Sequence, residues 1–177
     1  MDGYPNKNLV IRRMQKSDAQ KITEEEIAQG WDATVEKYEM RLLHQSEGRS
    51  AAFVAEYHGN VAGYINLYYH AEKGAFAEQG YPEIVDFGVL EKYRNKGIGS
   101  RLMDIAERTA SVYSDYVCLG VGLYGGYGSA QRMYVKRGYV FDGSGVWYQD
   151  KICEPYAECC NDDDLILYMS KRLKSEE

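Results

Sequence analysis

The sequence lacks several features that mark whole classes of protein. No apolar stretch approaches the roughly 18 residues that a membrane-spanning helix needs. Residues 1–8 contain neither the basic segment nor the apolar segment of a secretory signal, so the cytoplasm is the expected compartment. There is no basic cluster of the kind that binds nucleic acid, and no internal repeat. A membrane partner and a nucleic-acid partner are therefore not expected.

Metal-binding patterns are also missing. The four cysteines, Cys118, Cys153, Cys159 and Cys160, show no C-x-x-C spacing, and no H-x-x-x-H stands nearby to complete a zinc site. Adjacent cysteines bridge each other only with strain, so reduced thiols are expected, with Cys118 as a small core residue. The acidic run 162–164 is interpreted as a solvated turn before a strand rather than a hard-metal site. No metal is expected.

The composition is that of a globular protein. Of 177 residues, 45% are hydrophobic and 27% are charged, which is enough to bury a sizeable core within a single domain covering residues 1–177. The formal net charge of −6 chiefly favours solubility. It slightly favours cationic small molecules as partners.

Hydrophobic periodicity predicts the first half of the fold. Residues 9–12 form a short strand, and two helices follow, one after Ser17-Asp18 and one from Asp32, a predicted N-cap, to residues 47–49. Residues 51–57 and 61–68 then flank His58-Gly59-Asn60, which is typical of an antiparallel hairpin.

The second half alternates strands and helices. An irregular connection over residues 71–82 leads to a strand at 84–89 and a helix from 98 that closes near Tyr113. A strand at 117–121 and a helix from about 130 that closes at Gly138 follow. The last two strands are expected to open at 139–141 and to lie at 165–169. The early hairpin and the late sequential strands predict an α/β protein with a mixed sheet rather than a purely parallel one.

The most informative segment is Val89–Gly99, where a strand feeds a helix through a tight turn that contains Gly97 and Gly99. The start of a helix presents backbone N–H groups without intrahelical partners at the positive end of the peptide dipoles. Paired glycines also let an anion come close to the backbone. The segment therefore predicts a site for a pyrophosphate.

Two competing phosphate motifs do not fit the same residues. A dinucleotide fingerprint requires a third glycine three residues after Gly99, where this chain has Leu102. A Walker A loop requires Gly-Lys-Ser/Thr after an earlier glycine, whereas Lys96 precedes Gly97. A nucleotide-binding domain is thus disfavoured, and a merely glycine-rich structural turn stays as the alternative.

The residues Arg94–Gly99, Arg-Asn-Lys-Gly-Ile-Gly, resemble the Q/R-x-x-G-x-G/A signature of the GCN5-related N-acetyltransferase (GNAT) family. Ala130–Tyr139 resembles the second acetyl-CoA segment of that family, A-x-x-L-Y-x-x-x-G-F. The order of predicted elements is similar to the complete family fold over about residues 9–173. The resemblance implies a mixed, mostly antiparallel sheet of about six to seven strands flanked by about four helices. Tyr127 departs from the asparagine that is often found in relatives.

The resemblance implies acetyl-CoA as cosubstrate. Backbone groups of Phe87 and Val89 would face its pantetheine arm or acetyl carbonyl. The pyrophosphate would be bound by the segment of Arg94, Asn95, Lys96, Gly97, Ile98, Gly99 and Ser100, through amides more than side chains.

Acetyl transfer also needs a proton for the departing thiolate, and the resemblance places Tyr134 in that role. Simple packing is the alternative, because Tyr134 shares a helix face with Ala130 and Met133. Donation from a tyrosine of pKa about 10 to a thiolate of pKa about 8.5 is uphill by roughly 2 kcal/mol, so it requires a lowered pKa or a concerted step.

The base is expected at the start of the motif strand. The resemblance aligns Glu83 with the catalytic glutamate of the histone-modifying branch, and Asp86 is the rival. Strict alternation places Glu83 on the face of Val85, Phe87 and Val89, with Asp86 on the other face, although a bulge would alter that parity. A water relay beside a merely solvated Glu83 stays open.

Together these observations predict an N-acetyltransferase that moves acetyl directly from acetyl-CoA to a primary amine of a small molecule or peptide. A covalent route through Cys118 lacks an activating neighbour in the sequence. The alternative is a non-catalytic acyl-CoA-binding sensor. Many members of the family form dimers through varying surfaces, which leaves a homodimer open.

Overall fold

The computed structural model describes residues 8–173, which form two compact units. The first comprises the described residues up to Tyr68 together with Asp86–Arg108, and the second comprises Tyr69–Val85 and the described residues from Thr109 onward. Strand β4, Glu83–Val89, contributes its first three residues to the second unit and its last four to the first. No helix within residues 8–173 has the length and apolar character to cross a membrane.

The first unit begins with an antiparallel sheet. Its elements are β1 (Leu9–Arg13), α1 (Lys16–Ala28), α2 (Val35–Ser46), β2 (Ser50–Tyr57), β3 (Asn60–Tyr68), the end of β4, the short helix η1 (Glu91–Tyr93) and most of α3 (Ile98–Ala110). The β2–β3 hairpin turns through His58 at φ 51° and Gly59 at φ 78°. Two successive left-handed residues give the turn a twist that matches that of paired strands, which confirms the predicted hairpin.

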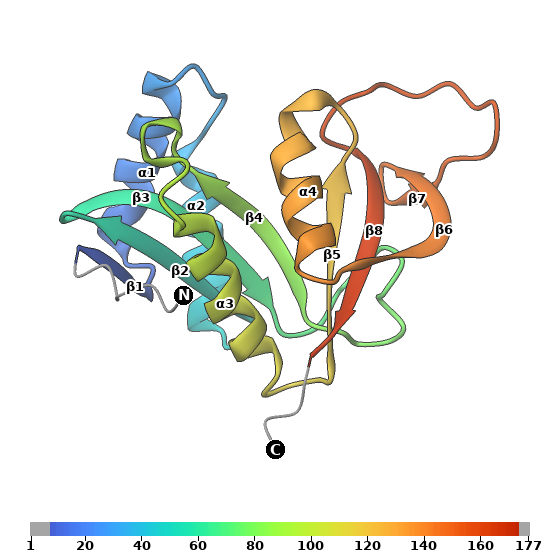
Figure 1. Cartoon of the computed structure of the whole chain (residues 1–177), viewed down its shortest axis with the longest axis horizontal. Coiled ribbons are helices and arrows are strands. Elements are labelled where there is room, and N and C mark those ends of the chain that lie inside the picture. The colour runs from blue at the N-terminus through green and yellow to red at the C-terminus, as the bar shows by residue number, and fades with distance from the viewer. Residues whose placement is uncertain (1–7, 174–177) are drawn as a thin grey trace. The chain divides into compact units, whose positions relative to one another are not determined.

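The helices of the first unit cover both faces of its sheet (Figure 1). On β3, the ring of Tyr64 packs edge to face against Tyr38 of α2, with centroids 5.3 Å apart. At the neighbouring Gly63, an added Cβ would project from the opposite face of the sheet and lie 3.2 Å from the side chain of Leu102 of α3. Since neighbouring strand residues face opposite sides, α2 and α3 lie on opposite faces.

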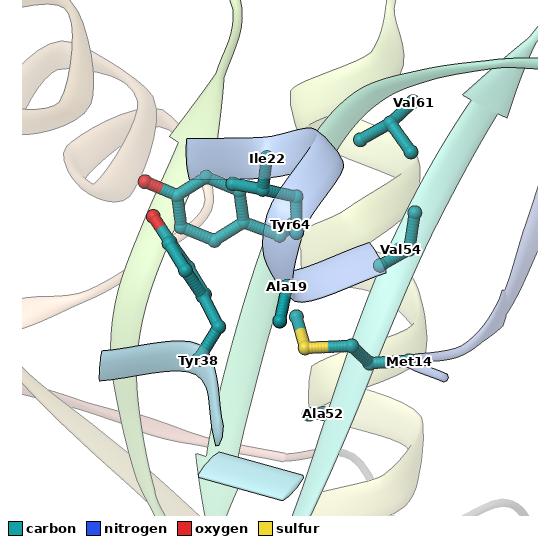
Figure 2. Close-up of a cluster of buried hydrophobic side chains, with 8 residues drawn as sticks. All are labelled: Met14, Ala19, Ile22, Tyr38, Ala52, Val54, Val61 and Tyr64. Carbon is teal, nitrogen blue, oxygen red and sulfur yellow. The ribbon is translucent and has the colours of Figure 1, made fainter. Parts of the chain in front are cut away.

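Helix α1 carries a buried acidic residue, Glu26, on the face that meets the core. Glu26 is 3% exposed and accepts hydrogen bonds from the hydroxyls of Tyr38, at 2.5 Å, and Tyr64. Figure 2 shows both rings among the apolar side chains, with their hydroxyls pointing the same way. Burial raises the pKa of both tyrosines, so each hydroxyl stays protonated and can act as a hydrogen-bond donor. The two donors compensate for the lost hydration of Glu26.

Replacing Tyr38 by phenylalanine should therefore lower the free energy of unfolding by about 2 kcal/mol, because one donor to a buried carboxylate is lost. Urea unfolding followed by circular dichroism measures this. The matched control is Tyr156→Phe, since Tyr156 is fully exposed and its hydroxyl is free to bond water. Equal midpoints for the two variants would contradict the account of Glu26.

The second unit holds the rest of the sheet. Its elements are the start of β4, β5 (Tyr116–Gly122), η2 (Gly125–Tyr127), α4 (Gly128–Lys136), β6 (Val140–Tyr148), β7 (Lys151–Ile152) and β8 (Leu165–Arg172). Strands β4 and β5 pair in parallel, whereas the pairs β5–β8, β8–β6 and β6–β7 are antiparallel. A core of Ala71, Phe76, Cys118 and Tyr168 lies in this unit, which confirms Cys118 as a core residue.

The mixed α/β fold and the four α-helices agree with the sequence prediction, with three corrections. Within residues 8–173 the hydrogen-bonded strand order β1-β2-β3-β4-β5-β8-β6-β7 contains eight strands rather than six to seven, because two residues after the turn at 149–150 pair as β7. Thr34, not Asp32, is the N-cap of α2. Helix α3 ends at Ala110, before Tyr113.

Candidate functional site

The turn from β4 into α3 has the geometry of an anion site. Asn95 and Gly97 adopt left-handed backbone conformations, at φ 60° and 76°. Helix α3 starts at Ile98, and the N–H of Arg101 donates to the carbonyl of Gly97 at 3.2 Å. Helix geometry leaves the N–H groups of the first turn, such as those of Ile98 and Gly99, without intrahelical acceptors. These amides and the helix dipole present partial positive charge.

Cationic side chains flank this turn. The side chain of Arg94 is half exposed, lies 3.8 Å from Glu91 and stands over the ring of Trp31. Lys96 is exposed, with its ammonium 5.6 Å from the ring centroid of Tyr57. The N–H of Arg94 donates to the carbonyl of Glu91 at 3.1 Å, so only its guanidinium is left to meet an anion.

The end of β4 packs closely against β3 in the first unit. A Cβ on Gly63 would lie 2.7 Å from the carbonyl oxygen of Gly88, and a Cβ on Gly88 would lie 2.7 Å from the hydroxyl oxygen of Tyr64. Both positions therefore need glycine. They fix β4 at Gly88, between Phe87 and Val89, which are both partly buried.

Glu83 lies in the second unit, at the start of β4, opposite Cys118 of β5. Burial raises the pKa of Glu83 to about 7; the charge of Lys73 lowers it, and those of Asp150 and Glu72 raise it. Lys73 itself donates to Asp150 at 2.6 Å. At neutral pH this carboxyl group is therefore divided between its protonated and ionised forms.

Tyr134 lies on α4, also in the second unit, and is 6% exposed. Its ring centroid is 5.7 Å from that of Tyr139. Helix α4 is fastened to β5 by the side-chain amide of Gln131, which donates to the carbonyl of Gly122 at 2.7 Å. Burial raises the pKa of Tyr134 and keeps the phenol protonated.

Tyr127, which stands where the family often has asparagine, directly precedes α4 as its N-cap residue. Its hydroxyl and that of Tyr124 both donate to Asp163, at 2.8 and 2.6 Å. Its ring covers Gly122, where an added Cβ would lie 2.3 Å from the ring. Asp163, in the acidic run 162–164, therefore accepts two hydrogen bonds from tyrosines. Within residues 8–173, no group of His, Cys, Asp or Glu side chains could hold a metal ion.

The predicted residues are divided between the two units. The first unit contains Phe87, Val89 and the segment 94–100; the second contains Glu83 and Tyr134. Asp86 has a left-handed backbone, at φ 52°, so β4 is irregular at this residue. Sequence reasoning also missed the charged neighbours of these carboxylates: Lys73 and Asp150 near Glu83, and Lys37 and Arg41 at Asp86.

No curated protein matches the sequence. Three solved structures share the fold: yncA of Salmonella typhimurium, with its cofactor acetyl-CoA (17% identity, TM-score 0.66, 96% of each chain); the ribosomal-protein-S18-alanine N-acetyltransferase of Escherichia coli (12%, 0.68, 96% of each chain); and a spermidine N-acetyltransferase SpeG chimera from Vibrio cholerae and hSSAT (15%, 0.64, 93% of this chain and 95% of that one).

The sequence profile of the acetyltransferase (GNAT) family matches residues 20–139, a span that contains the β4–α3 turn, Glu83 and Tyr134. Since the match covers more than half of the chain, the protein belongs to the acetyltransferase (GNAT) family.

Proposed function

We propose that this protein transfers an acetyl group from acetyl-CoA to a primary amine. The β4–α3 turn is the observation that carries the proposal, because its left-handed Asn95 and Gly97 lead directly into the N-terminus of α3. A pyrophosphate accepts hydrogen bonds from such amides and is stabilised by the helix dipole. Phe87 and Val89 offer backbone groups to the pantetheine arm.

In the proposed reaction, the nitrogen of the acceptor attacks the acetyl carbonyl carbon, so a C–N bond forms as the C–S bond breaks. Glu83 takes a proton from the amine, directly or through water. Its pKa of about 7 suits a base that works near neutral pH.

Tyr134 gives its proton to the departing sulfur. Because burial raises the pKa of Tyr134, full transfer to a free thiolate is more strongly uphill than for an ordinary tyrosine. The proton therefore moves in concert with cleavage of the C–S bond. A hydrogen bond to sulfur that strengthens as charge develops also stabilises the transition state.

The acceptor is an amine of a small molecule or peptide. The solved relatives include one named for a ribosomal protein alanine and one named for spermidine, so both classes belong in a test panel. Release of coenzyme A thiol from acetyl-CoA is measured with each amine. Amine-dependent release supports the proposal, whereas tight acetyl-CoA binding without turnover on any amine would support a sensor instead.

Replacing Gly97 by alanine should weaken acetyl-CoA binding about tenfold, because a left-handed conformation costs an L residue roughly 1–2 kcal/mol. A Cβ at Gly97 meets no atom within 4 Å, so the effect is conformational rather than steric. Isothermal titration calorimetry measures the affinity.

Gly48→Ala is the matched control, since Gly48 also has a left-handed φ, 73°, and open space around its Cα. Both variants meet a similar conformational cost at the substituted residue, but only Gly97→Ala should bind acetyl-CoA more weakly. Equal affinities in the two variants would remove the turn from the binding site.

A further inference from the structure

Asp86 has a conformation that needs an explanation. Six described non-glycine residues have a left-handed backbone, and Asp86, at φ 52°, is the only one of them inside a β-strand. A left-handed backbone is uncommon for any residue other than glycine; aspartate adopts it more readily than most, but within a strand it persists where the surroundings hold it. The strand therefore changes direction at Asp86, immediately before Phe87.

Two cations of α2 hold the Asp86 carboxylate in place. One oxygen pairs with Nε of Arg41, and the other lies 3.4 Å from Nζ of Lys37. Lys37 and Arg41 are four residues apart and thus lie on one face of the helix. The Asp86 side chain is only 18% exposed, so this pairing is partly shielded from solvent.

The guanidinium of Arg41 is itself anchored. Arg41 donates through Nη1 to the hydroxyl of Tyr68 on β3 at 2.6 Å, and that hydroxyl is bonded to Nδ1 of His44 at 2.5 Å. The guanidinium thus joins α2, β3 and β4. A planar guanidinium that bonds through two of its nitrogens has little freedom to reorient.

A second contact fixes the strand two residues later. The ring of Tyr64 lies against Gly88, and its hydroxyl donates to the buried Glu26 of α1. The backbone on both sides of Phe87 is therefore held by side chains that the helices α1 and α2 position.

We propose that Asp86 is a positioning residue for acetyl-CoA: its ion pairs with Arg41 and Lys37 hold the left-handed turn in β4 that directs the backbone groups of Phe87 and Val89. This inference rests on the proposed function. It also assigns Asp86 a role other than the base, because both of its carboxylate oxygens are engaged by cations.

The first test is hydrogen–deuterium exchange of a peptide that covers β4, which requires no ligand. Asp86→Ala and Arg41→Gln should each speed exchange at residues 87–89. Glu56→Gln is the matched control, because Glu56 also pairs with an arginine of the first unit, accepting from Arg12 at 2.6 Å. Exchange at residues 87–89 that is unchanged in both test variants would overturn the inference.

The second test compares acetyl-CoA binding and turnover. If only about one tenth of the Asp86→Ala molecules keep the turn in β4 that acetyl-CoA requires, the Kd for acetyl-CoA rises about tenfold. Asp86→Asn should restore most of this affinity, because asparagine tolerates a left-handed backbone and keeps an acceptor oxygen for Arg41. If Asp86 were instead the catalytic base, Asp86→Ala and Asp86→Asn would both lose kcat while the Kd for acetyl-CoA stayed unchanged. That result would overturn the inference.

The two proposals can fail separately. A wild-type protein that does not bind acetyl-CoA would refute the proposed function, while the exchange experiment would still report whether Asp86 holds β4. Normal acetyl-CoA binding by Asp86→Ala and Arg41→Gln would refute the positioning role and leave the proposed function standing.

Discussion

Replacing Tyr134 by phenylalanine should lower kcat about 100-fold, which is at the lower end of the effect expected for loss of a general acid. The affinity for acetyl-CoA should change little, because the phenylalanine ring fills the same space on α4. The effect on kcat is expected because the departing thiolate loses the only proton donor assigned to it. Steady-state kinetics and calorimetric titration measure the two quantities.

Tyr139→Phe is the control for this variant. Tyr139 is at least as buried as Tyr134, and the two rings are close neighbours, so its variant has a similar effect on packing. Its kcat should stay within about threefold of the wild-type value, a difference of less than 1 kcal/mol in the activation free energy. If Tyr134→Phe kept the wild-type kcat, Tyr134 would have only a packing role.

Replacing Glu83 by glutamine should remove the rise in rate that the wild-type protein shows as pH passes through about 7, the pKa of Glu83. The base must be ionised, so wild-type activity is low below this pKa and reaches its plateau above it. Glutamine cannot titrate, and kcat should fall about 100-fold on the plateau. The pH dependence of kcat/KM reports the ionisation in the free enzyme.

Lys73→Gln tests whether that ionisation belongs to Glu83. The charge of Lys73 lowers the pKa of Glu83, so its removal should move the rise in rate to higher pH while leaving the plateau in place. Lys73 is exposed, so solvent screens its charge and the displacement should be small. Identical profiles for wild type and Glu83→Gln would instead identify a water relay that does not need Glu83.

Local patterns in the sequence predicted most of the fold. The hairpin at His58-Gly59 was predictable because both turn residues must adopt φ > 0, which few residue types favour. The start of α3 was predictable because apolar residues recur at helical spacing directly after Gly97. Strand β7 was missed because a two-residue strand has no periodicity, and its pairing with Trp147 and Tyr148 arises only in the folded chain.

The site was less accessible to sequence reasoning, because its charges come from distant residues. Asp86 and its partner Arg41 are 45 positions apart, and Lys73 and Asp150 are 77 apart. No local pattern reports such pairs. The left-handed backbone of Asp86, at φ 52°, is an irregularity in β4 that periodicity cannot report. The pKa of Glu83 likewise depends on burial, which only the folded chain sets.

The most direct test of the central claim follows the acetyl group itself. Acetyl-CoA labelled with ¹³C in the acetyl group is incubated with the protein and the amine panel, and the products are analysed by mass spectrometry. The account predicts that at least one amine gains the labelled acetyl group on nitrogen, in a one-to-one ratio with coenzyme A released. Binding of acetyl-CoA with no acetylated amine anywhere in the panel would contradict it.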